Sequence, residues 1–237
     1  RVPLPVRHRL SIAGSVIEDV YFPEDGVVSI VAMGKGGRQF EVGVFGREGM
    51  SGTALILGAD RTPHQVYMQI AGQSGLRLPA TALAAVLEQS RAMDLLFRRY
   101  AQALLVQVSA SAAAAAGHTI DQRLARWLLM CHDRMDGDEL ILTHEFMAMM
   151  LSSRRASVTE ALHILEGERM IGTERGVVII RDRAALESRA GDGYGAAEAE
   201  YKRLIGTTLR RSEVDGDRRG VNGRSDGSNG GFSPAEA

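Results

Sequence analysis

The chain of 237 residues contains one cysteine, Cys131. A single cysteine excludes an intrachain disulfide and leaves no set of thiolates for an iron–sulfur cluster or a structural zinc ion. Cys131 lies in the apolar segment WLLMCHDR, so we expect a buried, unreactive thiol rather than a redox sensor. The histidines are scattered along the chain, and the sequence predicts neither a metal nor another cofactor.

Strong net charge and long apolar runs are missing too. The formal net charge at pH 7 is -1, so any affinity for nucleic acid has to come from a local patch. The most apolar segment, ALLVQVSASAAAAA, is too short to span a membrane and contains Gln107, Ser109 and Ser111. No signal peptide opens the sequence. We therefore expect a cytoplasmic protein without a membrane partner.

The motifs of the common enzyme classes are absent from the sequence. It contains no GxSxG, no P-loop and no glycine signature of a dinucleotide site. No helical pattern follows Gly34-Lys35-Gly36-Gly37, which predicts a hairpin turn rather than a phosphate cradle. The sequence therefore predicts a protein without enzymatic activity.

The first third of the chain has the patterns of β structure. Val27 to Val31 form an apolar run, and apolar residues alternate with other residues from Phe40 and again from Val66. Glycine-rich turn signals separate these segments. Short strands at this spacing predict a sandwich or jelly-roll barrel that ends near Pro79.

A long helical region follows. One helix is predicted over 80–89 and a second over about 91–116, where apolar residues repeat in steps of four and three, the spacing of a coiled-coil seam. We infer that one face packs on the β barrel and the other on the same helix of a second subunit; the alternative is a helix buried wholly within one domain. The candidate dimer contacts are Met93, Phe97, Tyr100, Leu104, Val108 and Ser111.

The most informative segment extends from Leu142 to Asp182. Two short helical patterns flank a Ser-Ser break, and a two-stranded wing is predicted after them. Two short helices joined by so tight a turn are typical of the helix–turn–helix unit, which lays its second helix in the DNA major groove. Sequence-specific binding of DNA is therefore the leading hypothesis.

Taken together, these segments resemble the Crp/Fnr (cyclic-AMP receptor protein and fumarate–nitrate regulator) family of bacterial transcription regulators. VYFPEDGVVSIV and EVGVFGREGMSG resemble the β-roll sensor of that family, and RLARWLL, LTHEFMAMML, RRASVTEALHILE and ERMIGTERGVVII resemble its DNA-binding domain. The resemblance implies an α+β fold with an N-terminal cyclic-nucleotide-binding-like β-roll (jelly roll), a long dimerisation helix and a C-terminal winged helix–turn–helix. The partners it implies are double-stranded DNA, a second copy of the chain and RNA polymerase.

Four segments are expected on this basis. They are a β-roll sensor over 1–90, a dimerisation helix and hinge over 91–117, a DNA-binding domain with C-terminal helices over 118–205, and a disordered tail over 206–237. Gly117 is the expected hinge residue. The tail has almost no apolar residues, so it cannot bury enough surface to offset its ordering entropy.

The predicted recognition helix has Ser153 as its N-cap, with Arg154 in its first turn. Arg155 matches the base-reading arginine of the family and is placed to donate two hydrogen bonds to O6 and N7 of a guanine. Ala156 replaces a frequent glutamate, and Glu160 stands where the cyclic-AMP receptor has an arginine, so we expect a different half-site. The candidate DNA contacts are Thr143, His144, Ser153, Arg154, Arg155, Ser157, Thr159, Glu160 and Arg175, the last at the wing tip.

The sensor departs from the family pattern. Relatives that bind cyclic nucleotides hold the ribose with a glutamate and the cyclic phosphate with an arginine, where this chain has approximately Thr53 and Pro63. Arg61 is close but two residues early. Without a buried cation the phosphate loses its counter-charge, so we expect no tight binding of cyclic AMP and leave the effector open.

Three functions remain to be weighed. The first is a homodimeric transcription regulator, and the second is a ligand-binding or protein-interaction module whose winged domain has lost its DNA affinity. The neutral charge, Ala156 and Glu160 motivate the second. An enzyme, the third, is disfavoured by the missing motifs.

Overall fold

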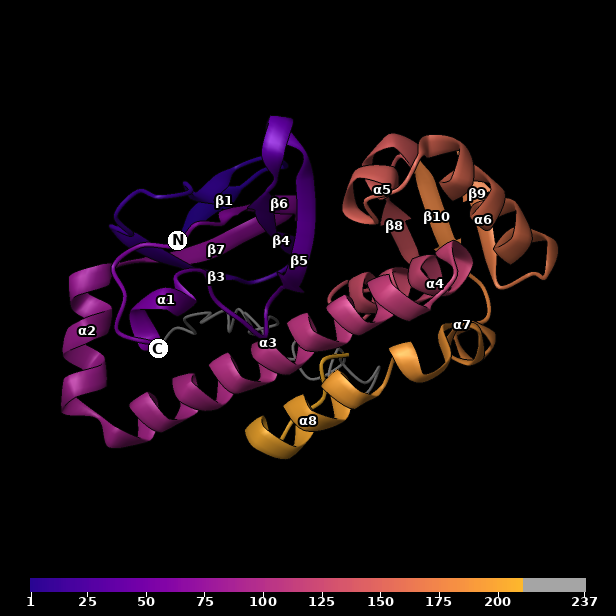
Figure 1. Ribbon diagram of the computed structural model, residues 1–237. Helices are drawn as coiled ribbons and strands as arrows, with labels where there is room; N and C mark the ends of the chain where they lie inside the picture. Colours follow the sequence, from indigo (N-terminus) through magenta and orange to yellow (C-terminus); the bar gives the residue numbers. More distant parts are fainter. Residues whose placement is uncertain (211–237) are drawn as a thin grey trace, which may run out of the picture.

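The computed structural model describes residues 1–210, which form an N-terminal β domain, a long central helix and a C-terminal domain of helices and strands (Figure 1). This order confirms the predicted fold class. Among the described residues no helix is both long and apolar enough to cross a lipid bilayer.

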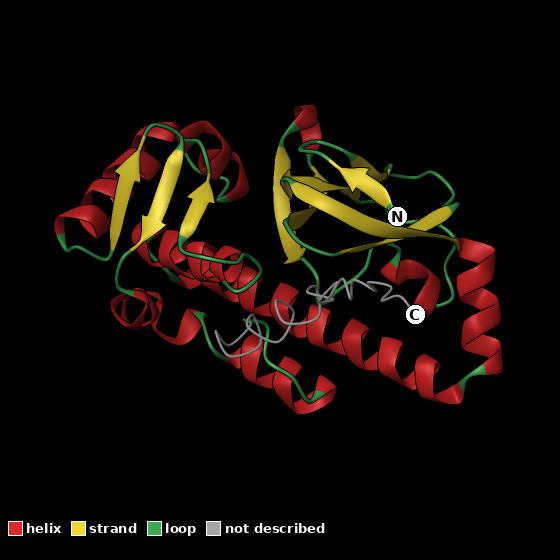
Figure 2. Ribbon diagram, turned by 180° about the vertical axis from the view of Figure 1, so that it is seen from behind, coloured by secondary structure: helices red, strands yellow, loops and turns green. Residues whose placement is uncertain are grey.

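The β domain consists of two antiparallel sheets packed face to face (Figure 2). Alternating apolar residues supply the core between them, with Leu4, Phe45 and Met68 fully buried. One sheet has the order β1-β7-β3, with β1 Val2–Leu4, β3 Asp19–Pro23 and β7 Gly72–Pro79. The other has the order β2-β6-β4-β5, with β2 Arg9–Ser11, β4 Val27–Met33, β5 Gln39–Phe45 and β6 Gln65–Ile70.

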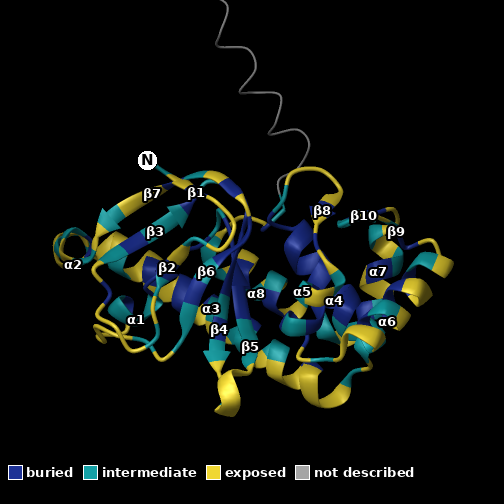
Figure 3. Cartoon of the chain, turned by 90° about the horizontal axis from the view of Figure 1, so that it is seen from above, coloured by how far each residue is buried: buried dark blue, intermediate teal, exposed yellow. Residues whose placement is uncertain are grey.

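A tight turn at Lys35–Gly37 joins β4 to β5, as the glycines predicted. Gly36 and Gly37 both have positive φ values, 72° and 77°, which only glycine adopts without strain. The tip of this β4–β5 hairpin is exposed and projects from its sheet (Figure 3). A short helix, α1 Thr53–Ile56, lies between β5 and β6.

Two helices lead out of the β domain, at the positions that the sequence predicted. Helix α2 spans Ala80–Gln89 after Pro79, and α3 spans Arg91–Gly117. The Ser90 side chain caps α3 by accepting a hydrogen bond from the Met93 N–H at 3.4 Å. Gly117 is the last residue of α3, and two extended residues separate it from α4.

Most residues of the predicted dimer seam on α3 make contacts within the chain. Phe97 packs against Phe22 with 6.1 Å between ring centroids, and the Tyr100 hydroxyl donates to the Met50 carbonyl at 3.3 Å. Leu104 and Val108 face β5, where their side-chain carbons would lie 3.5 and 3.3 Å from a Cβ at Gly43. The Ser111 hydroxyl donates to the carbonyl of Gln107, one turn earlier. Of the six residues only Met93 is exposed.

The outward face of α3 lies one to two positions away from that seam. It exposes Leu95 and Leu105, of which Leu105 is 58% exposed. Ala112, Ala113 and Ala116 continue this face toward the end of the helix. The outward face of α3 therefore combines exposed apolar side chains with the exposed polar side chains of Arg98, Gln102 and Ser109.

The C-terminal domain is built on α4, Ile120–His132, whose start has a capping box between Thr119 and Gln122. All residues from Leu124 to His132 are buried, including Cys131, and burial raises the pKa of its thiol. A three-stranded sheet of order β8-β10-β9 and four further helices complete the domain. Their bounds are β8 Glu139–Ile141, α5 His144–Met150, α6 Arg155–Gly167, β9 Ile171–Glu174, β10 Val177–Ile180, α7 Arg183–Ala190 and α8 Ala196–Ile205.

The expectation of a disordered tail from Gly206 needs a correction at its start. Helix α8 lies along α3, and Leu209 packs with Ala103 and Tyr201 at this contact. An isolated leucine in a polar segment carried no periodic signal for this contact. The rest of the predicted tail, residues 211–237, lies outside the described residues.

Candidate DNA interface

Helix α5 forms the first half of the helix–turn–helix, and Thr143 caps it as predicted. The Thr143 hydroxyl accepts a hydrogen bond from the Phe146 N–H at 3.3 Å, and Thr143 itself is exposed. Met147, Ala148 and Met150 are buried against the domain core. The cap therefore places Thr143 at the surface at the start of the unit.

The turn between α5 and α6 differs by one residue from the prediction. Ser152 is left-handed, with φ 49°, a strain of about 1 kcal/mol for a residue other than glycine. The Ser153 N–H donates to the Ala148 carbonyl at 2.9 Å, so Ser153 still belongs to the turn. The N-cap is Arg154, and its carbonyl accepts the first helical hydrogen bond, from Val158 at 3.2 Å. Ser153 as the cap was therefore wrong.

Helix α6 buries one face and exposes the other. Val158, Leu162 and Leu165 are fully buried, as their 3.6-residue spacing predicted. The opposite face exposes Glu160 and His163. Figure 3 shows α6 at the edge of the molecule. Of the candidate DNA contacts on this helix and its cap, Arg154, Arg155 and Glu160 are exposed, while Ser157 and Thr159 are half-buried.

His144 and Thr159 bind each other across the two helices. Thr159 Oγ1 lies 3.1 Å from His144 Nδ1 and 3.0 Å from the Arg155 carbonyl oxygen, to which its hydroxyl donates. Because that hydroxyl has one hydrogen, Nδ1 of His144 has to be the donor of the other bond. The pair therefore holds α5 at a fixed angle to α6, and only Nε2 of His144 is left for another partner.

The two-stranded wing predicted after the helix–turn–helix is present as β9 and β10, and a third strand, β8, which precedes the helix–turn–helix, joins the same sheet. Strand β8 pairs with β10 through Leu140 and Val178, and β10 pairs with β9. Strand β8 is only three residues long, too short to give a periodic signal. Arg175 and Gly176 form the turn between β9 and β10, which leaves Arg175 exposed at the wing tip.

Three arginines at this surface have no counter-charge within the part of the chain that the structure describes. Arg154, Arg155 and Arg175 make no ion pair or side-chain hydrogen bond there, unlike Arg183 and Arg189 in the same domain. Free guanidinium groups beside a helix start can donate to phosphate oxygens and to guanine. The geometry therefore suits a negatively charged polymer.

Solved structures with the same fold are transcription regulators. The chain matches a CRP-family regulator from Thermus thermophilus with a TM-score of 0.63 at 23% identity, over 83% of this chain and 100% of that one. It matches the c-di-GMP responsive regulator CLP from Xanthomonas campestris with a TM-score of 0.57 at 18% identity, over 76% and 92%. It matches FixK2 from Bradyrhizobium japonicum with a TM-score of 0.59 at 15% identity, over 80% and 96%. Likeness at these identities shows the fold alone, and no curated protein sequence matches the chain.

The DNA-binding unit is matched by sequence as well. Residues 122–189 match the family model of the Crp-like helix-turn-helix domain. Residues 122–189 thus form a Crp-like helix-turn-helix domain, and the chain has the fold of solved CRP-family regulators. The resemblance seen in the sequence is thereby confirmed, and the matched range contains α5, α6 and the wing.

The two domains pack more closely than any sequence pattern indicated. Val27, Val44 and Ile70 of the β domain share one core with α4 and α6. Arg134 and Glu48 form a buried ion pair across this interface at 2.8 Å, with 1% and 7% of their side chains exposed. Contacts between residues 86 positions apart produce no local pattern, which is why sequence reasoning missed them.

A hollow of about 640 Å³ separates the start of α6 from the β4–β5 hairpin. Arg154 and Ser157 line one side, and Arg38 and Phe40 line the other. Two of the candidate DNA contacts therefore face the β domain in this arrangement.

The positions that bind a cyclic nucleotide in relatives offer no buried cation here. Arg61 has 59% of its side chain exposed and lies 3.5 Å from Asp60, its carboxylate partner. Thr53 begins α1. The adjoining interior is filled by a core that includes Met50, Phe97 and Tyr100.

Proposed function

We propose that this regulator binds DNA as a homodimer and reads bases with Arg155 of α6. The observation that carries the proposal is an exposed, unpaired arginine in the first turn of a helix whose opposite face is fully buried. A guanidinium group there can donate twice to O6 and N7 of one guanine. Arg154, Arg175, Thr143, Ser157 and Ser153 would contact the phosphates around it, and Glu160 would accept from cytosine.

The second subunit would pack on the outward face of α3. Leu95 and Leu105 are exposed on a helix of 27 residues, and burying apolar side chains drives association. A two-fold axis beside α3 would present two copies of α6 to one side of a duplex, with half-sites one turn apart. RNA polymerase would be a further partner of the bound dimer.

The sensor would respond to a signal other than cyclic AMP bound in the β-roll. The exposed, carboxylate-paired Arg61 supports this, since a buried phosphodiester needs a cation close to it. The signal would act on the angle between the domains. A hollow of about 640 Å³ admits a small molecule but no duplex, so the start of α6 would have to leave the β4–β5 hairpin before it enters a groove.

Fluorescence anisotropy with genomic DNA fragments tests the proposal, with Arg155→Ala as the variant. Loss of a bidentate base contact costs about 1–3 kcal/mol, so we expect roughly 5- to 150-fold weaker specific binding. Arg61→Ala is the matched control, because it removes the same charge from an exposed site on the β domain and should leave the affinity unchanged.

The second candidate, an interaction module without DNA affinity, predicts a different outcome. Its supporting observations are the net charge of -1 and the exposed Glu160 on the recognition helix. Binding that is weak, independent of sequence and equal for the wild type and Arg155→Ala would favour this module and reject base reading by α6.

A further inference from the structure

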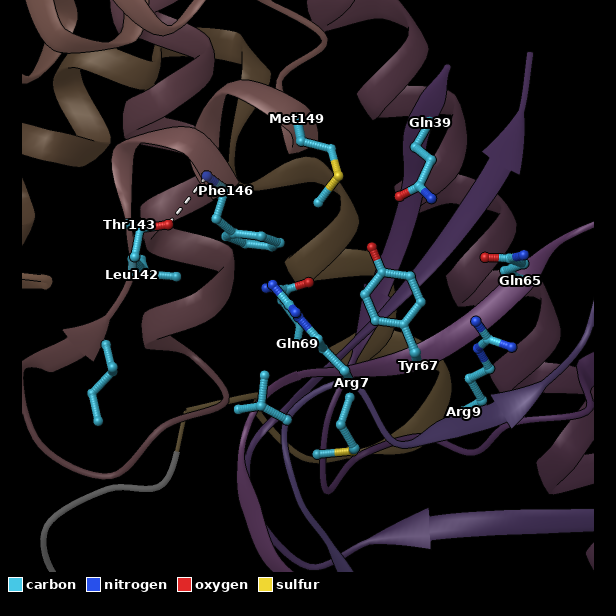
Figure 4. Close-up of a pocket in the computed structure, with 13 residues that line it drawn as sticks. Arg7, Arg9, Gln39, Gln65, Tyr67, Gln69, Leu142, Thr143, Phe146 and Met149 are labelled. Carbon is cyan, nitrogen blue, oxygen red and sulfur yellow. Dashed lines mark hydrogen bonds between the residues drawn. The ribbon is translucent and has the colours of Figure 1, made fainter. Parts of the chain in front are cut away.

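A cavity of about 480 Å³ lies between the β-roll and the helix–turn–helix, apart from the β-roll interior where relatives hold a nucleotide (Figure 4). Strands β2 and β6 supply one wall through Arg9, Tyr67 and Gln69. The other wall comes from Phe146 and Met149 of α5, with Leu142 ahead of it. Its size falls in the range of about 300–1,000 Å³ that is typical of small-molecule sites.

One wall of the cavity holds a buried acceptor without a partner. Gln69 is only 7% exposed, and its Oε1 makes no hydrogen bond among the described residues. The amide points into the space between Tyr67 and Phe146 (Figure 4). Buried polar atoms are nearly always paired, so an unpaired oxygen at the wall of a cavity indicates a donor that comes from outside the chain.

Two guanidinium groups without counter-charge stand at the same wall. Arg7 and Arg9 line the cavity, and neither forms an ion pair or a side-chain hydrogen bond in the part of the chain described. The Arg7 N–H donates to the Met68 carbonyl at 2.8 Å, which fixes Arg7 beside β6. Two unpaired guanidinium groups at one site suit a terminal carboxylate or phosphate, which can accept two parallel hydrogen bonds.

Rings from both domains face this space. Tyr67 comes from β6 and Phe146 from α5, and both extend into the cavity between the domains (Figure 4). Met149 adds a polarizable side chain next to them. Aromatic and methionine side chains of this kind bind flat rings well.

We propose that this cavity binds a small organic anion that combines a terminal carboxylate or phosphate with a flat ring bearing an N–H or O–H donor. The anionic group binds Arg7 and Arg9, the ring lies between Tyr67 and Phe146, and the donor satisfies Gln69 Oε1.

The ligand also has a regulatory effect, and this part rests on the proposed function. The two walls of the cavity belong to different domains: one to the β domain and the other to the C-terminal domain. Helix α5 also lines the hollow at the start of α6. A bound ligand therefore stabilises the arrangement in which α6 faces the β4–β5 hairpin. Ligand and DNA then oppose each other, and each lowers the affinity of the other by the same factor.

Isothermal titration of the full chain without DNA tests the site. The probes are GMP and 4-hydroxybenzoate, which have all three groups, benzoate, which lacks the donor, and inorganic phosphate, which lacks the ring. We expect at least one complete probe to bind once per chain with a micromolar Kd, and benzoate and phosphate to bind at least 10-fold more weakly. GMP and 4-hydroxybenzoate distinguish a nucleotide from an aromatic acid.

Variants tie the binding to this cavity. The double substitution Arg7→Ala and Arg9→Ala should weaken the complete probe at least 10-fold, whereas Arg61→Ala, an exposed arginine elsewhere on the β-roll, should not. Gln69→Leu removes the unpaired oxygen, so the melting temperature of the protein should not fall. The affinity for a complete probe should fall to that of benzoate, which lacks the donor. Trp127, the only tryptophan, has its ring 5.9 Å from that of Phe146 and should change its emission on binding.

The outcomes separate the site from the proposed function. Three results would each overturn the proposal. The first is no heat of binding with either GMP or 4-hydroxybenzoate at 1 mM, and the second is binding of inorganic phosphate as tight as that of GMP and of 4-hydroxybenzoate. The third is binding that the Arg7 and Arg9 substitutions leave intact. Binding that passes these tests but raises the affinity for DNA would overturn its regulatory part alone. Failure of DNA binding without ligand would reject the proposed function and leave the titration result standing.

Discussion

Glu41 joins the two domains through a single carboxylate. Its Oε2 accepts from the Ser29 hydroxyl at 2.5 Å, and its Oε1 accepts from the Trp127 indole N–H at 2.6 Å. Burial raises the pKa of Glu41 to about 7, although both hydrogen bonds act in the opposite direction. The carboxyl group therefore changes its charge near neutral pH, at the contact between sensor and DNA-binding domain.

Glu41→Gln should make stability less dependent on pH. The pKa is raised from its ordinary value of 4.5 to about 7, so the folded chain holds a proton that the unfolded chain releases. Wild-type stability from this group is greatest below pH 4.5 and falls as the pH rises through 7. The glutamine amide can keep a hydrogen bond, because the Ser29 hydroxyl can accept as well as donate.

Urea unfolding at pH 5 and pH 8 measures this effect. Between pH 5 and pH 8, the free energy of unfolding of Glu41→Gln should rise by up to about 3 kcal/mol relative to that of the wild type. The free energy of unfolding of the exposed Glu145→Gln should not change relative to the wild type. An equal free-energy difference from the wild type at both pH values would show that Glu41 is ionised throughout.

At the scale of single residues, the sequence predicted side chains whose roles are local. Thr143 is a cap and Val158 is buried because short-range spacing determines both. In the sequence, nothing distinguishes Glu41 from the other polar residues of an alternating strand, and its partner Trp127 is 86 positions away. No local pattern reports such a contact, and the same holds for Arg134 with Glu48.

Among the elements, α3 shows best which features of a helix can be predicted from its apolar spacing and which cannot. Its length and its start after Gln89 were predictable from spacing and capping. The side of the helix that packs within the chain was not predictable, because two apolar tracks have the same period and only the packing of the β domain distinguishes them. The track with Phe97 and Tyr100 packs inside, and the track with Leu95 and Leu105 is exposed.

The double substitution Leu95→Glu and Leu105→Glu should dissociate the dimer without unfolding the subunit. Four charges brought together at one seam repel each other, while in the monomer both side chains are exposed to water, 47% and 58%. Light scattering after size exclusion should give one subunit for this variant and two for the wild type.

Two controls make that result specific. Leu57→Glu places the same residue at a site 72% exposed on the β domain and should remain dimeric. Phe97→Ala should lower the free energy of unfolding by about 3–5 kcal/mol, because it leaves a cavity in the core, yet keep the subunits together. A variant with Leu95→Glu and Leu105→Glu that stays dimeric would place the interface elsewhere.

On the scale of the whole molecule, the β domain and the C-terminal domain form one packed unit rather than two domains joined only by a linker. They share a core at Val27, Val44 and Ile70, and the Arg134–Glu48 pair is buried between them. Separating the domains would expose the apolar residues of this shared core to water, which is costly. Movement of α6 away from the hairpin therefore has to draw on the free energy of binding DNA or of releasing a ligand.

Sequencing of DNA fragments selected from a random pool by the purified dimer tests the central claim most directly. Two copies of α6 related by a two-fold axis predict an inverted repeat whose half-sites are centred about 10–10.5 base pairs apart. A guanine opposite Arg155 should occur in each half and lose its enrichment in the pool selected by Arg155→Ala. A pool that yields no symmetric motif, or one that Arg155→Ala selects unchanged, would contradict the account.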